Sequence, residues 1–92
     1  MRKVEITIQQ RFFEELVSLM ITKHILNYSV FDISKGHGDK GDSLDYGFIS
    51  VDRNMLVVII CNESEFNTIK ELIAPYVKEV EGMIYVSQIE LL

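Results

Sequence analysis

The stretch Met55–Cys61, MLVVIIC, decides the fold because it is an unbroken run of apolar, largely β-branched residues. A run of this kind is typical of a strand inside a sheet whose two faces are both covered. Asn62 follows the run, and Glu65 stands three residues later, which is the spacing of a capping box at a helix start. We therefore expect a buried strand that leads directly into a helix.

The helix after Asn62 should have one apolar side, and the residues expected to be buried on it are Phe66, Ile69, Leu72 and Ile73. Pro75 should kink or end this helix, because proline lacks a backbone N–H and clashes with the preceding turn. Gly82 then precedes MIYVSQIELL (83–92), which has strong β propensity and predicts a last strand.

The N-terminal half has a matching order of elements. Residues 3–8, KVEITI, alternate apolar and polar side chains, which predicts a half-buried strand. From Gln10 the apolar residues recur every three or four positions, which predicts an amphipathic helix ending near residues 26–27. Its apolar stripe comprises Phe12, Phe13, Leu16, Val17, Met20 and Ile21. YSVFDISK (28–35) predicts a second strand, and FISV (48–51) can extend a hairpin toward Met55.

The predicted order is β-α-β, a loop, and β-α-β within one domain, 1–92. This order is typical of an α+β, ferredoxin-like split βαβ fold, a four-stranded antiparallel sheet with two helices on one face. Two helices cover one face only, and the apolar content of 48% is high. We therefore expect sister subunits, about three in all, to bury the other face.

Composition excludes several classes of protein. The net charge of −5 argues against nucleic-acid binding, which needs a basic surface. The sequence has no run of about 20 apolar residues that would insert into a bilayer and no apolar leader region, so we expect a cytoplasmic protein. Cys61, the single cysteine, lies inside the apolar run and is expected to be a buried structural thiol.

The segment KGHGDKGDSLDYG (35–47) carries four of the five glycines. It satisfies G-x-G-x-x-G by letter, but no helix is expected to follow it, which argues against a dinucleotide site. The P-loop lysine and the distal glutamate of a calcium loop are also missing. No nucleophile or acid pair stands out, so we expect no enzyme activity. Backbone amides at Gly36 and Gly38, beside Lys35 and Lys40, could receive a phosphate.

Taken together, the segments resemble the PII signalling family, and more closely its PII-like branch. RKVEITI resembles the opening strand of the family, and YSVFDISKGHGDKG resembles its second strand and the base of its T-loop. LVVIICNESEFNTIKELI resembles the third strand and second helix, and EGMIYVSQIELL resembles the B-loop end and fourth strand. The likeness spans nearly all 92 residues.

The resemblance implies a non-catalytic homotrimer that binds an adenine nucleotide in clefts between neighbouring subunits. It places Lys35, Gly36, His37 and Gly38 on the phosphate side, and Glu81 and Gly82 on the next subunit's B-loop. Ser29 would lie near the adenine. The family's basic residues fall near Met55 and on Met83, and the family's C-terminal arginines are missing. Arg53, two residues before Met55, is the candidate substitute for the first of them. AMP or ADP therefore fits better than ATP.

The resemblance further implies that the loop 36–47 docks on a partner, plausibly a membrane transporter. Two alternatives stay open. The chain could be a metal-responsive trimer similar to the CutA-type divalent-cation tolerance proteins, with His37 and Asp39, Asp42 or Asp45 as ligands. It could also be a structural trimer that binds no ligand.

Overall fold

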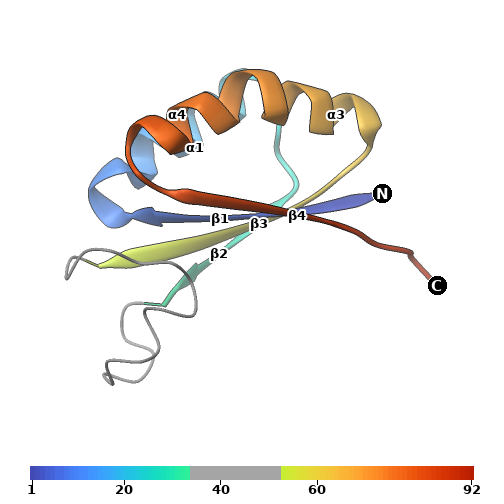
Figure 1. The fold of residues 1–92 in the computed structure, drawn as a ribbon, viewed down its shortest axis with the longest axis horizontal. Coiled ribbons are helices and arrows are strands. Elements are labelled where there is room, and N and C mark those ends of the chain that lie inside the picture. The colour runs from blue at the N-terminus through green and yellow to red at the C-terminus, as the bar shows by residue number, and fades with distance from the viewer. Residues whose placement is uncertain (34–52) are drawn as a thin grey trace.

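The computed structural model describes residues 1–33 and 53–92. Their elements, in chain order, are β1 (Arg2–Gln9), the 3-10 turn η1 (Gln10–Phe12), α1 (Phe13–Thr22), β2 (Tyr28–Asp32), β3 (Asn54–Cys61), α3 (Glu63–Thr68), the π-helical segment η2 (Ile69–Ile73), α4 (Ala74–Glu79) and β4 (Met83–Gln88). The strands form one antiparallel sheet in the order β2-β3-β1-β4. Both helical stretches lie on the same face of that sheet (Figure 1). The predicted ferredoxin-like fold is confirmed.

The register of the sheet separates its two faces. Val4, Ile6 and Ile8 of β1 are buried on the helix side, and they pair with Ile59, Val57 and Met55 of β3. Directly paired residues of antiparallel strands share a face. The odd-numbered residues of β1 therefore lie on the uncovered face, together with their partners in the neighbouring strands.

The helix layer completes the core through residues spaced four apart. Leu16 and Met20 of α1 are buried, as are Ile69, Ile73 and Val77 of the second helical stretch. The predictions for two other apolar residues were wrong. Ile21 and Leu72 are 50% and 47% exposed, because each stands next to a residue that already occupies the core-facing position.

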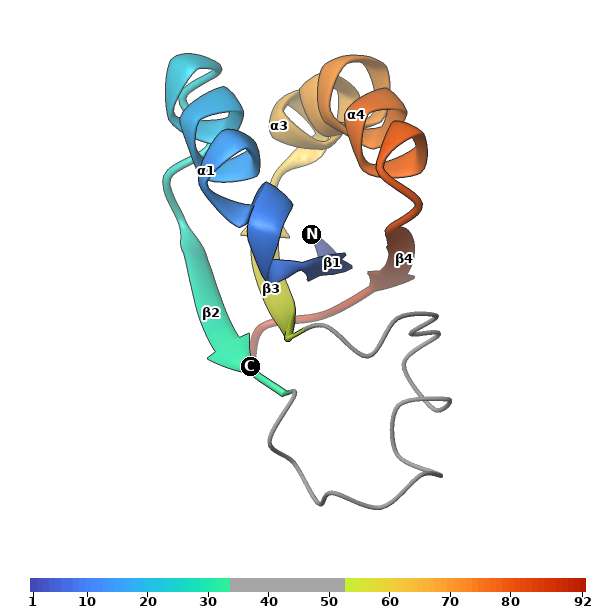
Figure 2. The same ribbon diagram turned by 90° about the vertical axis from the view of Figure 1, so that its left-hand side faces the viewer.

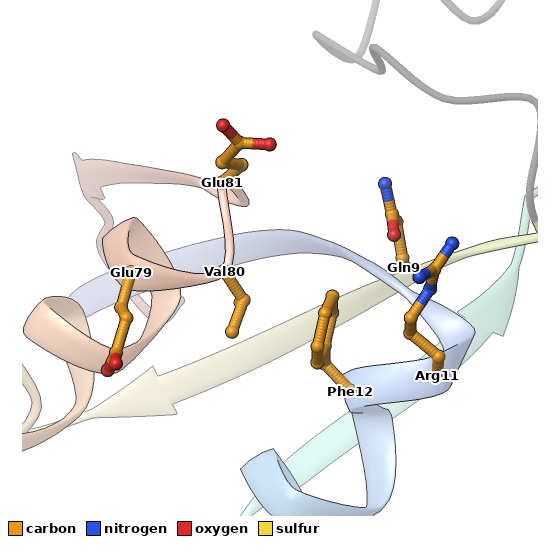
Figure 3. Close-up of a pocket in the computed structure, with 6 residues that line it drawn as sticks. All are labelled: Gln9, Arg11, Phe12, Glu79, Val80 and Glu81. Carbon is orange, nitrogen blue, oxygen red and sulfur yellow. The ribbon is translucent and has the colours of Figure 1, made fainter.

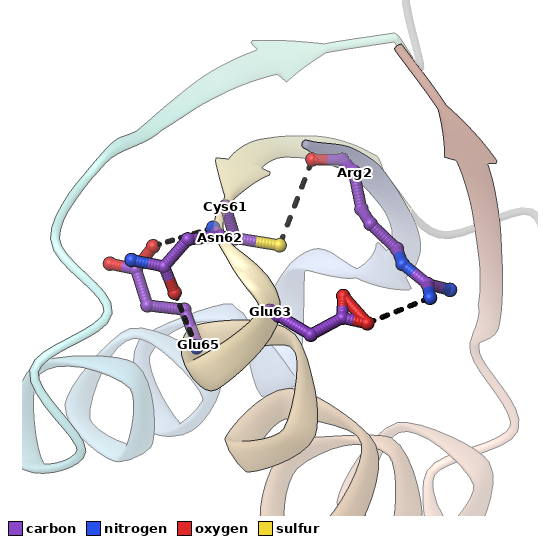
Figure 4. A network of polar contacts seen from close by, with 5 residues as sticks. All are labelled: Arg2, Cys61, Asn62, Glu63 and Glu65. Carbon is purple, nitrogen blue, oxygen red and sulfur yellow. Dashed lines mark hydrogen bonds and ion pairs between the residues drawn. The ribbon is translucent and has the colours of Figure 1, made fainter.

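The junction between β3 and α3 matches the sequence prediction (Figure 4). The Asn62 side chain accepts a hydrogen bond from the Glu65 backbone N–H at 2.8 Å, and the Glu65 carboxylate accepts one from the Asn62 N–H at 2.9 Å. This reciprocal pair is the capping box. Beside it, Arg2 pairs with Glu63 at 2.9 Å.

Pro75 interrupts the second helical stretch without ending it. The chain widens into the π segment η2 before it and continues as α4, with Pro75 in the first turn of α4. Proline lacks an N–H and is therefore tolerated in a first turn. Of the two predicted outcomes, the interruption is confirmed and the termination is wrong.

The first helix ends earlier than predicted, at Thr22 and not near residues 26–27. His24 follows with a φ of 62°, its N–H bonds the Ile21 carbonyl at 2.9 Å, and the Ile25 N–H bonds the Met20 carbonyl at 2.8 Å. These two bonds form a Schellman motif, which satisfies the last free carbonyls of the helix. Ile25 is buried and fixes the exit of the chain toward β2.

The outer strands are shorter than predicted. β2 ends at Asp32 and β4 at Gln88, although the Ile33 N–H still bonds the Asn54 carbonyl and the Ile89 N–H the Met1 carbonyl. The predicted hairpin segment 48–51 lies outside the described residues. None of the described helices is both long and apolar enough to cross a membrane.

Candidate functional site

One end of the sheet gathers several of the predicted site residues. Gln9 pairs with Asn54 and Thr7 with Met83, so the end of β1 and the starts of β3 and β4 lie together (Figure 2). Arg53 immediately precedes β3, and Glu81 and Gly82 immediately precede β4. The structure therefore brings these three predicted residues to the same end of the sheet.

Ser29 lies elsewhere. It is an exposed residue of the edge strand β2, and it pairs with Val58 on the uncovered face. β2 and β4 are the opposite edges of the sheet, about 14 Å apart at the usual strand spacing. A ligand held by both Ser29 and Glu81 would therefore need two different subunits. Lys35, Gly36, His37, Gly38 and Lys40 lie outside the described residues.

Arg53 is engaged within its own chain. Its guanidinium pairs with the Asp32 carboxylate at the end of β2, and its carbonyl accepts a hydrogen bond from the Gln10 N–H at 2.8 Å. The side chains of Arg53 and Asp32 are 52% and 30% exposed. An exposed ion pair contributes roughly 0–1 kcal/mol, so an incoming anion could compete with Asp32 for Arg53.

Glu81 and Gly82 form a second Schellman motif, at the end of α4. The Glu81 N–H bonds the Lys78 carbonyl at 3.1 Å, and the Gly82 N–H bonds the Val77 carbonyl at 2.8 Å. Glu81 has a φ of 64°, a conformation that disfavours any residue other than glycine by about 1–2 kcal/mol. A glutamate therefore stands where glycine would be without strain.

Gly82 is needed for a close approach between backbones. A Cβ atom at Gly82 would lie 2.7 Å from the Thr7 carbonyl oxygen and 3.3 Å from the Val77 carbonyl oxygen. Both contacts involve backbone, which cannot move aside easily. Gly82 thus holds the end of α4 against β1 and fixes the position of Glu81.

A pocket of about 480 Å³ opens beside this helix end (Figure 3). Its lining residues come from the end of β1 and η1 on one side and from the end of α4 on the other: Gln9, Arg11, Phe12, Glu79, Val80 and Glu81. This volume is within the usual range for small-molecule sites. Phe12 and Val80 are half-buried and form an apolar floor.

The sequence analysis named Glu81 as a candidate site residue but named none of the other residues that line this pocket. Arg11 lies two residues beyond β1, in a segment interpreted only as the start of an amphipathic helix. The Arg11 guanidinium carbon is 5.7 Å from the centre of the Phe12 ring, within reach of a weak cation–π contact. The only available signal was a lone arginine among apolar and acidic residues, which does not specify a site.

Two titratable side chains of the described residues, both outside the pocket, have shifted pKa values. Burial raises the pKa of the Cys61 thiol, and nearby Glu65 adds to the effect. Cys61 is 1% exposed, and its sulfur lies 3.7 Å from the Arg2 carbonyl oxygen (Figure 4). A raised thiol pKa lowers the thiolate population, so this residue fits the predicted buried structural thiol.

Among the residues that the structure describes, Tyr76 is the other one with a shifted pKa. Burial, and then the hydrogen bond to Glu15, raise the pKa of its hydroxyl. The hydroxyl donates to the Glu15 carboxylate at 2.7 Å and lies 3.2 Å from the Phe12 carbonyl oxygen. Tyr76 therefore links the second helical stretch to the first.

Among residues 1–33 and 53–92, no group of three or more histidine, cysteine and acidic side chains is placed to hold a metal ion. The predicted alternative ligands, His37, Asp39, Asp42 and Asp45, lie outside these ranges. The metal-responsive reading stays an untested prediction.

Comparison with solved structures supports the fold. The chain is similar to CPII from Thiomonas intermedia K12 bound to ADP, AMP and acetate, with a TM-score of 0.73 and 18% identity, over 98% of this chain and 86% of that one. It is also similar to the same protein bound to ADP, AMP and bicarbonate, with a TM-score of 0.72 and 16% identity, over 98% and 90% of the two chains. The apo form of CPII gives a TM-score of 0.72 at 16% identity, over 98% and 89%.

Comparison with curated protein sequences gave no match. The family model for nitrogen regulatory protein P-II, in contrast, matches residues 1–91, which is nearly the whole chain. Members of that family are regulatory signalling proteins and generally not catalysts. The resemblance drawn from the sequence is confirmed, and the chain belongs to the nitrogen regulatory protein P-II family.

Proposed function

We propose that this chain is a non-catalytic, cytoplasmic PII-like regulator that assembles as a homotrimer. It binds an adenine nucleotide at the clefts between subunits. Binding controls how the loop 36–47 docks on a partner protein, such as a membrane transporter.

The uncovered face of the sheet is the observation that carries the proposal. β3 contributes Leu56, Val58 and Ile60 to it, and the two edge strands, β2 and β4, add Phe31, Met83 and Tyr85. The last three are 50%, 39% and 42% exposed in the single chain. An apolar face of this kind, opposite the helix layer, is typical of a surface that another subunit buries.

Polar residues on the same face favour a defined assembly over aggregation. β1 places Lys3, Glu5 and Thr7 between the apolar residues of β3 and β4. Charged side chains inside an interface fix its register, because a misaligned partner would bury them without compensation. The face therefore suits a specific contact with copies of the same chain.

Two observations support a nucleotide between subunits. The predicted adenine-side residue, Ser29, and the predicted B-loop residues of the next subunit, Glu81 and Gly82, lie at opposite edges of one sheet. In addition, the similar CPII structures were solved with ADP and AMP bound. Ser29 of one subunit and Glu81 of the next can form one cleft only if the subunits assemble side by side.

The small number of basic side chains near the proposed site favours a ligand with few phosphate groups. Met83 stands where the family has a lysine, and Arg53 is paired with Asp32. Each missing charge-assisted hydrogen bond removes about 1.5–3 kcal/mol of binding energy. We therefore expect AMP or ADP to bind more tightly than ATP. The loop residues 35–40 would supply further phosphate contacts from backbone amides.

Light scattering and calorimetry test the proposal together. We expect a trimer mass and saturable heats with AMP and ADP, with or without bicarbonate. The Ser29→Trp variant should lose nucleotide binding if Ser29 borders the adenine. Gln88→Trp, at an exposed position on the helix side of the opposite edge strand, should remain trimeric and bind normally. A monomer in solution, or no heat with AMP, ADP, ATP or cyclic AMP at millimolar concentration, would remove the proposal.

A further inference from the structure

The uncovered face of the sheet carries two opposite charges near its centre. Lys3 and Glu5 of β1 both lie on this face, and two strand residues separate their positions by about 7 Å. β1 is an inner strand between β3 and β4, and the helix layer covers the opposite face (Figure 1). Both charges therefore lie within the face and not along its edges.

The surroundings of Lys3 and Glu5 on this face contain no other charge. Of the residues that the described strands place there, these two are the only charged ones. The sheet register gives each a set of uncharged neighbours, which are Ile60 and Ser87 beside Lys3, and Val58 and Tyr85 beside Glu5.

Neither charge has an ion-pair partner within the described part of its own chain. The ion pairs between Arg2 and Glu63 and between Arg53 and Asp32 involve neither of them. Lys3 and Glu5 are half-buried in the single chain, so water still solvates each of them. A second subunit that covers the face removes this water, and a buried charge without a partner is strongly destabilising.

We propose that Lys3 of one subunit pairs with Glu5 of the neighbouring subunit, and that these ion pairs determine the register in which the subunits pack. The inference rests on the proposed function and names the residues that select the partner, a second copy of this chain. In a closed ring, each subunit contacts its neighbours through two different parts of its surface. A face with one positive and one negative charge is complementary to itself in such a contact, and every Lys3 and every Glu5 is paired once.

The same two charges disfavour wrong registers. A neighbour displaced along the face would bury Lys3 or Glu5 against apolar residues such as Val58 and Ile60, or against a like charge. Both outcomes are unfavourable, so the charges act against misaligned assemblies as well as for the correct one. An entirely apolar face would not make this distinction.

Charge reversal tests the inference. Lys3→Glu and Glu5→Lys each replace an attractive pair by two like charges, so each variant alone should need a protein concentration about 100-fold higher or more to assemble. The double variant Lys3→Glu/Glu5→Lys restores opposite charges and should assemble like the wild type. Light scattering over a dilution series measures assembly, and circular dichroism reports whether each variant is folded. Recovery in the double variant separates lost pairing from misfolding.

A mixture of the two single variants distinguishes pairing between subunits from pairing within one chain. Lys3→Glu chains carry two negative charges on the face, and Glu5→Lys chains carry two positive charges. We expect native mass spectrometry of the mixture to detect assemblies that contain both chains, at concentrations where each variant alone is dissociated. If Lys3 and Glu5 neutralise each other only within one chain, the mixture should stay dissociated, and the inference is wrong.

The matched controls are Lys78→Glu on α4 and Glu71→Lys on η2, both at exposed positions of the helix layer. They change the net charge by the same amounts as Lys3→Glu and Glu5→Lys, but they leave the uncovered face unaltered. Both should assemble like the wild type, which would show that position and not net charge decides the effect.

The outcomes separate the two proposals. If the wild type is trimeric and both single reversals assemble like it, the ion-pair inference is overturned and the proposed function stands. A trimer that responds to charge reversal but binds no nucleotide would support the inference and overturn the nucleotide part of the proposed function. A monomeric wild type would overturn both.

Discussion

The two halves of the chain end their helices in the same way but use the ending differently. In both, a residue other than glycine adopts a left-handed conformation, His24 with a φ of 62° and Glu81 with a φ of 64°. In the first half the next residue is Ile25, which is 2% exposed and packs in the hydrophobic core. In the second half it is Gly82, which has no side chain and lies against the Thr7 backbone.

This difference shows how one local motif can serve packing or function. A buried side chain anchors the first ending, so the chain leaves toward β2 in a fixed direction. The second ending is anchored by Gly82, which has no side chain and so lets the end of α4 lie close to β1. This close approach holds Glu81 at the pocket. The first ending should therefore affect stability alone, and the second should affect both stability and ligand binding.

The largest expected effect on stability comes from replacing Ile25, the anchor of the first half. Ile25→Ala removes a fully buried side chain and should lower the free energy of unfolding by about 3 kcal/mol. Urea denaturation measures this change. Leu26→Ala is the control, since Leu26 is 63% exposed and should cost less than about 0.5 kcal/mol. Equal effects of the two variants would contradict the assigned packing.

The second-largest expected effect on stability comes from Gly82, the anchor of the second half. Gly82→Ala places a methyl group 2.7 Å from the Thr7 carbonyl oxygen, and such overpacking should destabilise the protein by about 2 kcal/mol. Because the helix end must shift, nucleotide affinity should also fall, which Ile25→Ala should not cause at temperatures where it is folded. Denaturation and calorimetry on both variants check the two effects. A Gly82→Ala protein with wild-type stability would show that the close approach does not exist.

Tyr76, which links the second helical stretch to the first, gives the third prediction. Tyr76→Phe removes the hydrogen bonds to Glu15 and Phe12, which should lower the free energy of unfolding by about 1 kcal/mol. The raised pKa of Tyr76 means that the folded protein holds this proton more strongly than the unfolded chain. Its contribution is therefore complete below the ordinary tyrosine pKa of about 10 and is lost as the pH rises above it.

Denaturation curves at several pH values between neutral and strongly alkaline test this linkage. Wild type should lose stability above pH about 10 more steeply than Tyr76→Phe. Tyr28→Phe is the control, because Tyr28 lies on the helix side of the edge strand β2, away from the face that the proposed trimer buries. The account of Tyr76 is wrong if Tyr76→Phe and wild type have the same alkaline slope.

The smallest expected effect compares the two left-handed residues directly. His24→Gly and Glu81→Gly should each raise the free energy of unfolding by about 0.5–1 kcal/mol, because glycine adopts the conformation without strain. Lys23→Gly, at a position with a negative φ, should destabilise the protein instead. Only Glu81→Gly should change nucleotide affinity. A change of nucleotide affinity in His24→Gly would contradict the distinction between the halves.

The sequence was most informative where one local pattern decides the structure. The apolar run 55–61 and the pair Asn62 and Glu65 each specify their own conformation, so the buried strand and the capping box were predicted correctly. Adjacent apolar residues such as Met20 and Ile21 were harder, because composition does not say which of the two faces the core. Their placement depends on the rotation of the whole helix.

The pocket could not be predicted for a related reason. Its residues come from positions 9–12 and 79–81, which meet only because β1 pairs with β4 in one register. The Schellman motifs were also missed, since His24 and Glu81 stand where the usual signal is glycine. The predicted residues 35–40 lie outside the described part of the chain, so their role stays a prediction.

Native mass spectrometry in the presence of ADP tests the central claim, an adenine-nucleotide site formed between subunits, most directly. One spectrum reports both the number of subunits and the number of nucleotides bound to each assembly. The account predicts a trimer that carries up to one ADP per subunit, and a monomer, released by activation, that carries none. A protein that is monomeric before activation, or ADP bound to the monomer as readily as to the assembly, would contradict it.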